Sequence, residues 1–427
     1  MRFRDDWEFR GLVHQVTDEA VFDQLDAGSI TAYIGFDPTA PSLHLGSLLQ
    51  LCSLRRLQLW GNRPIVLAGG GTGLVGDPTF KDAERPLLTL EQIHANVEGI
   101  RPQLERFLDF SVSAGVSRAS LLNNADWLTT ISLTEFLRDV GKHITVNQMI
   151  AKESVKTRLD RDDVGLSFTE FSYMLLQGYD FVRLHVDCGC TLQLGGSDQW
   201  GNITVGTELV RKMTGDQAYG LTTPLLLRGD GKKFGKSEGG NENVWLDAKV
   251  TSPFAMYQYL LNVDDVSAPA SLRFFTFLSH EEILALDEAT RTKPHERLAQ
   301  RALAREVLTL VHGEDAAHKA ERASEALFSE AIDDLDEVTL LEVVGDAPSS
   351  PWARTEFAEG LEPVELLVRT GLATSKAEAR RYVEQGGVYV NNRRLGANEL
   401  VDATRALHGK YLVIRRGRHE LHLVGVS

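Results

Sequence analysis

The feature that most constrains this chain is a regular alternation of strand-like and helix-like segments between about Ile30 and Val250. The strand-like run ITAYIGF comes first, the helix-like run SLLQLCSLRRLQLW follows it, and the strand-like run PIVLAGG comes third. Where strands alternate with helices in this way, each helix crosses over a sheet and the strands lie parallel. The sequence therefore predicts an α/β fold built on a parallel sheet.

The 427 residues divide into four parts by their patterns. Residues 1–250 form the α/β body. Strand patterns then disappear and apolar residues recur with helical spacing, so 251–345 is expected to be a helical domain. The stretch DAPSSPWARTEFAEG, 346–360, has no sustained period and is expected to be a linker. Residues 361–427 are expected to form a small α+β domain, with an Arg-rich helix after Ser375 and a closing hairpin that turns near Gly417.

The charge of the chain is negative overall but basic at its C-terminal end. The formal net charge of −15 argues against a protein that coats nucleic acid, whereas residues 361–427 carry 11 Lys and Arg against 7 Asp and Glu. A basic tail domain on an acidic body fits a local contact with a polyanion. Chance fluctuation in a short segment explains it equally well.

Targeting signals and cysteine usage both suggest an intracellular setting. The N-terminal run MRFRDDWEFRGL contains no apolar segment of the length that a secretion signal needs, and nothing approaches a membrane-spanning stretch. Cys52, Cys188 and Cys190 cannot all pair with one another, and such sparse use suits a reducing compartment. We therefore expect a cytoplasmic protein with no membrane partner. Cys188 and Cys190 supply too few ligands for zinc, and no metal site of the protein's own is expected.

Two glycine-containing loops have the composition of a nucleotide site. The first, GFDPTAPSLHLGS at 35–47, lies between the first strand and the long helix, whose N-terminal N–H groups can hold phosphates. Its Gly46 gives room for a sugar or base, and Thr39 and His44 are candidates for bonds to phosphate oxygens. The second, GDGKKFGKSEGG at 229–240, places three lysines where a triphosphate would be clamped. Each loop alone is more often a plain connection or a solvated turn.

Two other nucleotide-binding fingerprints are only partly matched. The second loop approaches the Walker A pattern, but Asp230 stands where the first glycine is required. The run GTGLVG at 71–76 matches the dinucleotide pattern GxGxxG and makes a dehydrogenase an alternative enzyme class. Its context is poor, because Pro78 follows closely and Glu91, the candidate ribose ligand, lies in a helix-like run.

Taken together, the two loops resemble the paired signatures of class I aminoacyl-tRNA synthetases. HLGS at 44–47 is similar to the HIGH signature, and KFGKS at 233–237 is similar to the KMSKS signature. The resemblance implies a Rossmann-like catalytic domain in which the two loops lie on either side of ATP. Ser47 stands where the signature has its second histidine, which implies a weaker or water-mediated phosphate contact.

A polar stripe on one helix predicts a second part of the site. Ser167 and Glu170 have the spacing of a capping box, and Tyr173, Gln177 and Asp180 recur along the helix that they open at i, i+4 and i+7. Three polar groups on one face would ordinarily face solvent. The apolar residues that crowd the same helix indicate burial instead, so we interpret the stripe as a binding surface.

The run YMLLQGYDF at 173–181, Tyr33 on the first strand and the run GGSDQW at 195–200 closely resemble bacterial tyrosyl-tRNA synthetases. The resemblance implies that Asp180 and Tyr33 contact the phenol of L-tyrosine. It gives the other tyrosine contacts to Tyr173, Gln177 and Asp77 at the ammonium group, Asn124 in the pocket, and Gln199 near the carboxylate. It places the contacts to ATP at Gly35, Asp37, His44, Gly46, Ser47, Gly196, Asp198, Lys233, Lys236 and Ser237.

The implied reaction has two steps. The tyrosine carboxylate attacks the α-phosphorus of ATP, and the adenylate then passes tyrosine to the 3′ end of tRNA(Tyr). No side chain acts as a nucleophile, so catalysis is positioning and charge stabilisation. The residues expected to do this are Thr39, His44, Lys233 and Lys236, with Lys81 and Arg85 reaching the pyrophosphate. Mg²⁺ is expected to accompany ATP on its phosphates.

The basic C-terminal run RTGLATSKAEARRYVEQGGVYVNNRRL resembles the S4-type RNA-binding module. Arg380, Arg381, Arg393 and Arg394 are the candidates for tRNA phosphate contacts. The resemblance also implies that the helical domain contacts tRNA and that the protein is a homodimer with its interface around Leu133 to Lys152.

Two alternatives stay open beside the dehydrogenase. A tryptophanyl enzyme is the nearest rival within the class, and Asp180 and the S4-like tail count against it. A non-catalytic RNA-binding scaffold would explain the tail but would leave both loops and the pocket without a purpose.

Overall fold

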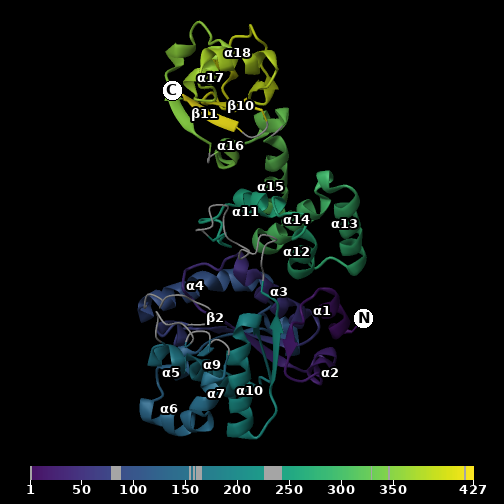
Figure 1. Ribbon diagram of the computed structural model, residues 1–427, viewed down its shortest axis with the longest axis vertical. Coiled ribbons are helices and arrows are strands. Elements are labelled where there is room, and N and C mark those ends of the chain that lie inside the picture. The colour runs from purple at the N-terminus through teal and green to yellow at the C-terminus, as the bar shows by residue number, and fades with distance from the viewer. Residues whose placement is uncertain are drawn as a thin grey trace. The chain divides into compact units, whose positions relative to one another are not determined.

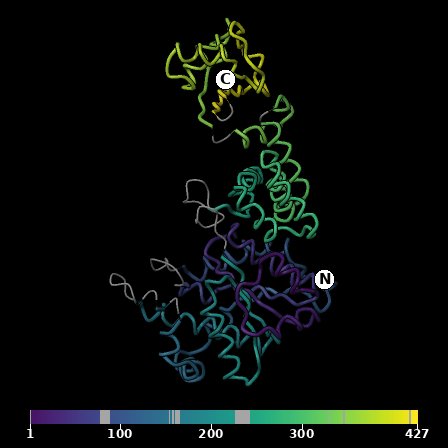
Figure 2. The backbone as a smooth tube through the Cα atoms, turned by 45° about the vertical axis from the view of Figure 1, so that its right-hand side comes forward, coloured from purple at the N-terminus to yellow at the C-terminus, as the bar shows by residue number. Residues whose placement is uncertain are grey.

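The computed structural model describes residues 2–77, 88–152, 155–156, 159, 166–225, 243–327, 329–344, 347–417 and 420–427. The chain separates into two compact units. One comprises Met1–Thr251 and Asn262–Val311, and the other comprises Ser252–Leu261 and His312–Ser427. Each unit is therefore built from two stretches of sequence. Figure 2 follows the backbone by colour, from purple at the N-terminus to yellow at the C-terminus.

A six-stranded sheet forms the centre of the first unit (Figure 1). Its order is β1-β6-β5-β2-β3-β4, and every neighbouring pair is parallel except β1 with β6. The strands are β1 (Gln15–Val16), β2 (Thr31–Phe36), β3 (Arg63–Ala68), β4 (Ser120–Asn123), β5 (Leu192–Gly196) and β6 (Tyr219–Thr223). The predicted α/β fold with a parallel sheet is confirmed.

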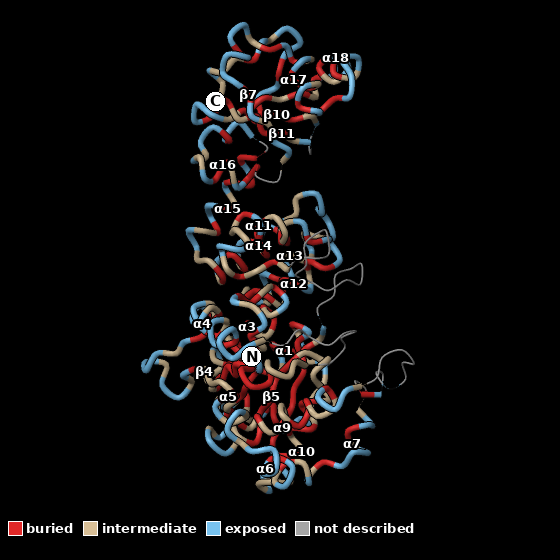
Figure 3. Tube along the Cα trace, turned by 90° about the vertical axis from the view of Figure 1, so that its left-hand side faces the viewer, coloured by how far each residue is buried: buried red, intermediate tan, exposed pale blue. Residues whose placement is uncertain are grey.

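Helices cover both faces of this sheet, with α3 and α4 on one side and α9 and α10 on the other (Figure 1). Buried residues run along the strands between these layers (Figure 3). The helices of the first unit are α1 (Phe3–Phe9), α2 (Val21–Asp26), α3 (Leu45–Leu59), α4 (Leu90–Phe107), α5 (Ala125–Leu128), α6 (Leu133–Asp139), α7 (Val146–Ile150), α9 (Phe168–Cys188), α10 (Trp200–Thr214), α12 (Ala268–Phe275), α13 (His280–Thr292) and most of α14 (Leu298–His312).

Local chemistry sets both ends of α9, the helix that carries the predicted polar stripe. The Ser167 hydroxyl accepts a hydrogen bond from the Glu170 amide, and the Glu170 carboxylate accepts one from the Ser167 amide. This reciprocal pairing satisfies two N–H groups that have no partner inside the helix. At the other end Gly189 adopts a φ of 66°, which ends the helix in a conformation that favours glycine.

The GxGxxG run does not open a crossover helix. After β3 the chain forms a 3-10 turn at Thr72–Leu74, and Glu91 lies exposed in the first turn of α4. A dinucleotide site needs the pyrophosphate at a helix N-terminus that directly follows the glycines. That arrangement is absent from the described residues up to Asp77.

The second unit contains a five-stranded sheet of order β7-β11-β10-β8-β9. Its strands are β7 (Ser349–Trp352), β8 (Val388–Val390), β9 (Arg393–Arg394), β10 (Tyr411–Arg416) and β11 (Glu420–Val426), and its helices are α11 (Pro253–Leu261), α15 (Glu314–Ala326), α16 (Glu337–Val344), α17 (Pro363–Arg369) and α18 (Lys376–Glu384). The hairpin β10–β11 turns at Gly417, where φ is 62°, as expected.

The predicted linker, 346–360, is corrected by the structure. Residues 349–352 form β7, which pairs in parallel with β11. Trp352 and Phe357 are buried in the core of the C-terminal sheet and helices, where their rings stack. Two large aromatic side chains anchor this segment, so its proline and serine content does not make it a free connection.

The described residues of the region 251–345 are mainly helical, as predicted, but the helices do not form one compact body. Helices α12 and α13 and most of α14 belong to the first unit, whereas α11, α15 and α16 pack against the C-terminal sheet. Apolar residues from α11, α15 and α16 share a core with Leu407, Val413 and Leu423. None of the helices in the described part of the chain is long and apolar enough to span a membrane.

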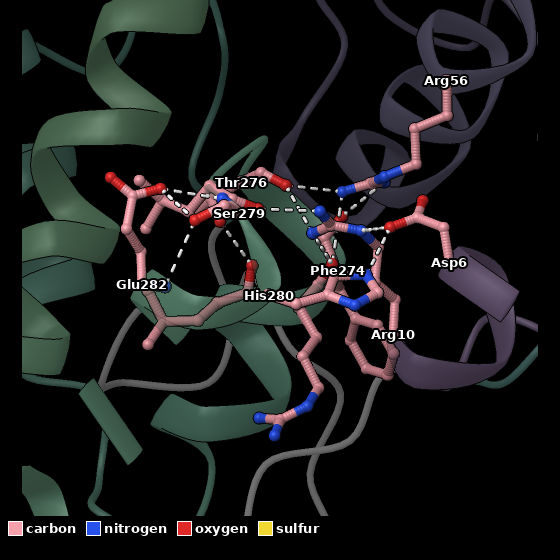
Figure 4. Close-up of polar contacts among 11 residues, drawn as sticks. Asp6, Arg10, Arg56, Phe274, Thr276, Ser279, His280 and Glu282 are labelled. Atoms are coloured by element: carbon pink, nitrogen blue, oxygen red, sulfur yellow. Dashed lines mark hydrogen bonds and ion pairs between the residues drawn. The ribbon is translucent and has the colours of Figure 1, made fainter. Parts of the chain in front are cut away.

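A buried polar cluster joins α1 and α3 to the connection between α12 and α13 (Figure 4). Arg10 donates from Nε to Asp6 at 2.8 Å and from its Nη atoms to the carbonyls of Arg273, Thr276 and Leu278. Arg56 donates to the carbonyls of Arg273, Phe274 and Thr276. Both guanidinium groups thus supply donors to carbonyls at the C-terminal end of α12, which no longer have helical partners.

Candidate active site

A cleft opens at the carboxyl ends of the parallel strands, where β2 and β5 lie side by side. The crossovers run in opposite directions from these two strands, and ligands of open α/β sheets bind at such a switch point. The cavity there has a volume of about 630 Å³. It is lined by fourteen of the predicted site residues: Tyr33, Gly35, Asp37, His44, Gly46, Ser47, Asp77, Asn124, Tyr173, Gln177, Asp180, Gly196, Asp198 and Gln199.

Asp180 is a buried carboxylate held by two donors. Asn124 donates from Nδ2 to Oδ2 at 2.8 Å, and Trp127 donates from Nε1 to Oδ1 at 2.7 Å. Burial raises the pKa of Asp180 to about 7, although the hydrogen bonds from Asn124 and Trp127 act in the opposite direction. A carboxylate with fixed orientation and remaining lone pairs is a hydrogen-bond acceptor for a ligand in the cleft.

Two tyrosines lie close to this carboxylate. Tyr33, on β2, is 1% exposed, and its hydroxyl has no hydrogen-bond partner among the described residues. Burial, and then the charge of Asp180, raises the pKa of Tyr33 well above its usual value. Burial, and then the charge of Asp37, does the same to Tyr173. Both phenols are therefore neutral donors at physiological pH.

A chain of amide side chains runs from α9 to Asp77. Gln199 donates from Nε2 to Asp77 at 2.9 Å and accepts from Gln177 at 3.3 Å. Asn202, on α10, donates from Nδ2 to Gln177 at 3.0 Å and to Gln199 at 3.2 Å. This network presents a carboxylate and amide oxygens on one side of the cleft, which is a suitable setting for an ammonium group.

His44 is the N-cap of α3. Its Nδ1 accepts a hydrogen bond from the Gly46 amide at 3.0 Å, which leaves Nε2 as the protonated nitrogen of the neutral ring. Burial lowers the pKa of His44, so the ring is neutral at physiological pH. A Cβ atom at Gly46 would lie 2.7 Å from the His44 ring, so glycine is required for this cap.

The structure separates the remaining predicted residues into three groups. Thr39 is exposed in the loop between β2 and α3 and is not among the residues that line the cavity. Lys81, Arg85, Lys233, Lys236 and Ser237 lie outside the described residues. The four arginines proposed to contact tRNA all belong to the second unit.

Those arginines are exposed at two neighbouring places. Arg380 and Arg381 lie on α18, and Arg393 and Arg394 form β9. The Arg394 guanidinium packs over Gly386, directly after α18, so the two places are close together. Arg393 also forms an ion pair with Asp333 at 2.6 Å.

Three functional candidates were missing from the sequence prediction. Trp127 and Thr72 bond to Asp180 and Asn124, and Asn202 joins Gln177 to Gln199. Trp127 lies within the short helix α5, Thr72 begins the 3-10 turn after β3, and Asn202 lies in the first turn of α10. Nothing in the neighbouring sequence marks these three residues as polar contacts. The closest local signal was the run NNADW at 123–127, which contains both donors to Asp180.

A larger cavity of about 980 Å³ opens elsewhere in the first unit. It is lined by residues at the amino ends of β2, β3 and β4, including Arg63, Arg101, Arg118 and Glu105. None of the predicted site residues lines it. Because parallel sheets bind ligands at their carboxyl ends, the smaller cleft is the candidate active site.

Comparison with known proteins identifies the family of this chain. Residues 25–329 match the family model of tRNA synthetases class I (W and Y), and residues 344–424 match the tyrosine--tRNA ligase SYY-like C-terminal domain. The tyrosine--tRNA ligase of Roseiflexus castenholzii is 51% identical over 98% of both chains, and that of Opitutus terrae is 48% identical over the whole of both. The chain belongs to the tyrosine--tRNA ligase family of class I synthetases.

A solved structure of a family member supports the same fold. The C-terminally truncated mitochondrial tyrosyl-tRNA synthetase of Aspergillus nidulans has a TM-score of 0.67 and 33% identity, and the match covers 77% of this chain and 94% of that one. As a class I synthetase, the enzyme uses ATP as a substrate. Membership of this family contradicts the dehydrogenase and the non-catalytic scaffold, and the matched C-terminal domain separates it from the tryptophanyl enzymes.

Proposed function

We propose that this enzyme activates L-tyrosine with ATP and transfers it to the 3′ end of tRNA(Tyr). The observation that carries the proposal is the buried Asp180 carboxylate, held by Asn124 and Trp127 at the end of a cleft that also contains Tyr33. A substrate phenol that donates to Asp180 and accepts from Tyr33 satisfies buried polar groups. Phenylalanine leaves them unpaired, which is costly.

The rest of the amino acid is bound by the groups nearer the cleft mouth. The ammonium group lies against Asp77, Gln177 and Tyr173, where a carboxylate, an amide oxygen and a phenol oxygen accept its three protons. Gln199 orients Asp77 through its 2.9 Å hydrogen bond and lies near the substrate carboxylate. That carboxylate is then placed to attack the α-phosphorus of ATP in line, with pyrophosphate as the leaving group.

ATP lies between the two signature loops. Gly35, Asp37, Gly46, Gly196 and Asp198 line the side of the cleft that receives the nucleoside. His44 donates from Nε2 to a phosphate oxygen, with Thr39 and Ser47 nearby. Lys233, Lys236 and Ser237 are the proposed further contacts to ATP, and Lys81 and Arg85 are the proposed contacts to the pyrophosphate. This arrangement stabilises the charge that develops on the phosphates.

Mg²⁺ enters with ATP, bound by phosphate oxygens. Among the described residues, no three His, Cys, Asp or Glu side chains converge to form a cage of the protein's own. The ion neutralises charge on the departing pyrophosphate when it is bound. The residues of the cleft position the two reacting atoms.

The second unit binds tRNA through Arg380, Arg381, Arg393 and Arg394, with the helices between 251 and 345 contributing further contacts. Guanidinium groups at the surface of a small α+β domain bind phosphates, so binding weakens as salt rises. After activation, a terminal ribose hydroxyl of tRNA(Tyr) attacks the carbonyl carbon of tyrosyl-adenylate. The carbonyl–phosphate bond breaks and AMP leaves.

The active form is a cytoplasmic homodimer whose interface includes Leu133 to Lys152. The apolar side chains Leu133, Leu137 and Val146 are 70%, 50% and 58% exposed in the single chain. Apolar residues exposed together commonly mark an interface. Sedimentation velocity is expected to give twice the mass of the chain, and Leu133→Asp is expected to shift the protein toward monomer; a wild-type monomer would contradict the assignment.

The pH dependence of tyrosine binding tests the Asp180 contact. The pKa of Asp180 in the free enzyme is about 7, and a hydrogen bond from the substrate phenol favours the ionised form. Tyrosine therefore binds more tightly as pH rises from 6 to 8, by up to about tenfold per pH unit below the pKa. Calorimetric titration over this range measures the effect, and a flat profile would rule out the contact.

ATP–pyrophosphate exchange tests the proposed function as a whole. Purified protein is expected to exchange label with tyrosine and not with phenylalanine or tryptophan. Exchange with none of the three by folded protein would refute the activation step. Exchange with tryptophan would move the substrate assignment to the other branch of the class.

A further inference from the structure

Gln193 is a buried polar side chain in the cleft that none of the roles above uses. It lies on β5, it lines the cavity, and only 2% of its surface is exposed. Its Oε1 has no hydrogen-bond partner, and its Nε2 bonds to no residue in the described part of the chain. Since Nε2 makes no hydrogen bond within the described part of the chain, it can donate one to a ligand in the cleft that Gln193 lines.

The neighbours of Gln193 place it at the end of the cleft that holds the substrate ring. Gln193 is the register partner of Tyr33 across the parallel pair β5 and β2, so the two side chains stand next to each other on one face of the sheet. A Cβ atom at Gly206, on α10, would lie 3.1 Å from Gln193 Oε1. The missing side chain at Gly206 thus leaves the space that the amide oxygen occupies, and this helps to fix the direction of the amide.

The hydroxyl group of bound tyrosine can accept one more hydrogen bond than Asp180 and Tyr33 provide for. A phenol offers one proton and two acceptor lone pairs, and an ionised carboxylate can only accept. Asp180 therefore takes the phenol proton of the substrate, and Tyr33, whose own hydroxyl has no partner among the described residues, donates to the phenol oxygen. One lone pair of that oxygen still needs a donor.

We propose that Gln193 supplies this donor, from Nε2 to the phenol oxygen of bound tyrosine, and is a specificity-determining residue of the enzyme. The inference rests on the proposed function, since it assigns a further contact within the same substrate site. The contact would give Gln193 Nε2 an acceptor beside Tyr33, whose hydroxyl also has no partner among the described residues. Phenylalanine leaves Gln193, Tyr33 and Asp180 unsatisfied together.

The test compares Gln193→Met with the wild-type protein in ATP–pyrophosphate exchange, using tyrosine and phenylalanine separately. Methionine keeps the size of the side chain and removes both polar groups. The preference for tyrosine over phenylalanine in kcat/KM is expected to fall about tenfold or more, through a loss with tyrosine alone. Gln50→Met is the matched control, because Gln50 lines the same cavity from α3 and its Oε1 also lacks a hydrogen-bond partner among the described residues. It is expected to leave the preference unchanged.

The outcomes separate the two proposals. A wild-type protein that is active with tyrosine, together with a Gln193→Met variant that keeps the wild-type preference, overturns the Gln193 assignment alone. An equal loss with both amino acids also overturns it, since that result indicates a structural role. A folded wild type without tyrosine-dependent exchange overturns the proposed function, and the Gln193 contact with it. If Gln193→Met fails to fold, Gln193→Asn, which withdraws the amide by one methylene, is expected to lose preference in the same direction.

Discussion

Replacing Asp180 with asparagine is expected to lower tyrosine-dependent ATP–pyrophosphate exchange by at least about a hundredfold, with little change in exchange with phenylalanine. The substitution keeps the shape of the side chain but puts an N–H group where a carboxylate oxygen stood. Asn124 or Trp127 then faces a donor instead of an acceptor, and the substrate phenol loses its charged acceptor. Each loss costs about 1–3 kcal/mol, and about 1.4 kcal/mol corresponds to a tenfold change.

The control for this prediction lies on the same helix. Asp187→Asn also removes a carboxylate from α9, but Asp187 is partly exposed and pairs with Arg183 at the surface. Surface ion pairs contribute little, so this variant is expected to remain within about twofold of wild type. If Asp180→Asn keeps both the rate with tyrosine and the preference over phenylalanine, Asp180 does not contact the substrate phenol.

Replacing Arg10 with methionine is expected to destabilise the first unit by about 3–5 kcal/mol. Arg10 and Asp6 are each 6% exposed and form a buried ion pair at 2.8 Å (Figure 4). Without Arg10, the Asp6 carboxylate loses its ion-pair partner but keeps its contact with His280 at 2.9 Å, and the Leu278 carbonyl loses the Arg10 donor. An uncompensated buried charge is among the few causes of a loss this large.

A double substitution separates charge from packing in this cluster. Removing both members of a buried pair costs less than removing one, so Arg10→Met with Asp6→Leu is expected to recover part of the loss. Arg291→Met, at an exposed ion pair on α13, is the control and is expected to change stability by less than about 0.5 kcal/mol. Differential scanning calorimetry is suited to the measurement, because a chain of two units need not unfold in one step. A Tm of Arg10→Met equal to that of wild type would show that the cluster contributes nothing to stability.

Patterns within short stretches of sequence were sufficient to predict the parallel sheet of this enzyme and the polar face of α9. Alternating periods indicated the parallel sheet, and the capping pair Ser167 and Glu170 located the start of α9. Helical spacing placed Tyr173, Gln177 and Asp180 on one stripe, and all three line the cleft. These features depend on residues within two or three turns of one another, so local geometry determines them.

Amino-acid composition gave a wrong prediction for a segment that a few large buried side chains anchor in the fold. The stretch 346–360 is rich in proline and serine, yet Trp352 and Phe357 bury it in the C-terminal fold. The helices between 251 and 345 share one pattern but belong to two units. Which apolar face packs on which core depends on surfaces far away in the sequence, and periodicity does not report them.

The amino-acid sequence by itself determined the class of fold, the two signature loops and the polar face of α9, because each depends on residues that are close together in the sequence. Only the tertiary structure decided which distant residues those side chains contact. Trp127 reaches Asp180 from 53 positions away, and Arg10 meets carbonyls more than 260 positions along the chain. Gln193 becomes a candidate for substrate recognition only because β5 pairs with β2 beside Tyr33. Burial gives these contacts their strength, since a polar group removed from water depends on whichever partner the fold brings to it.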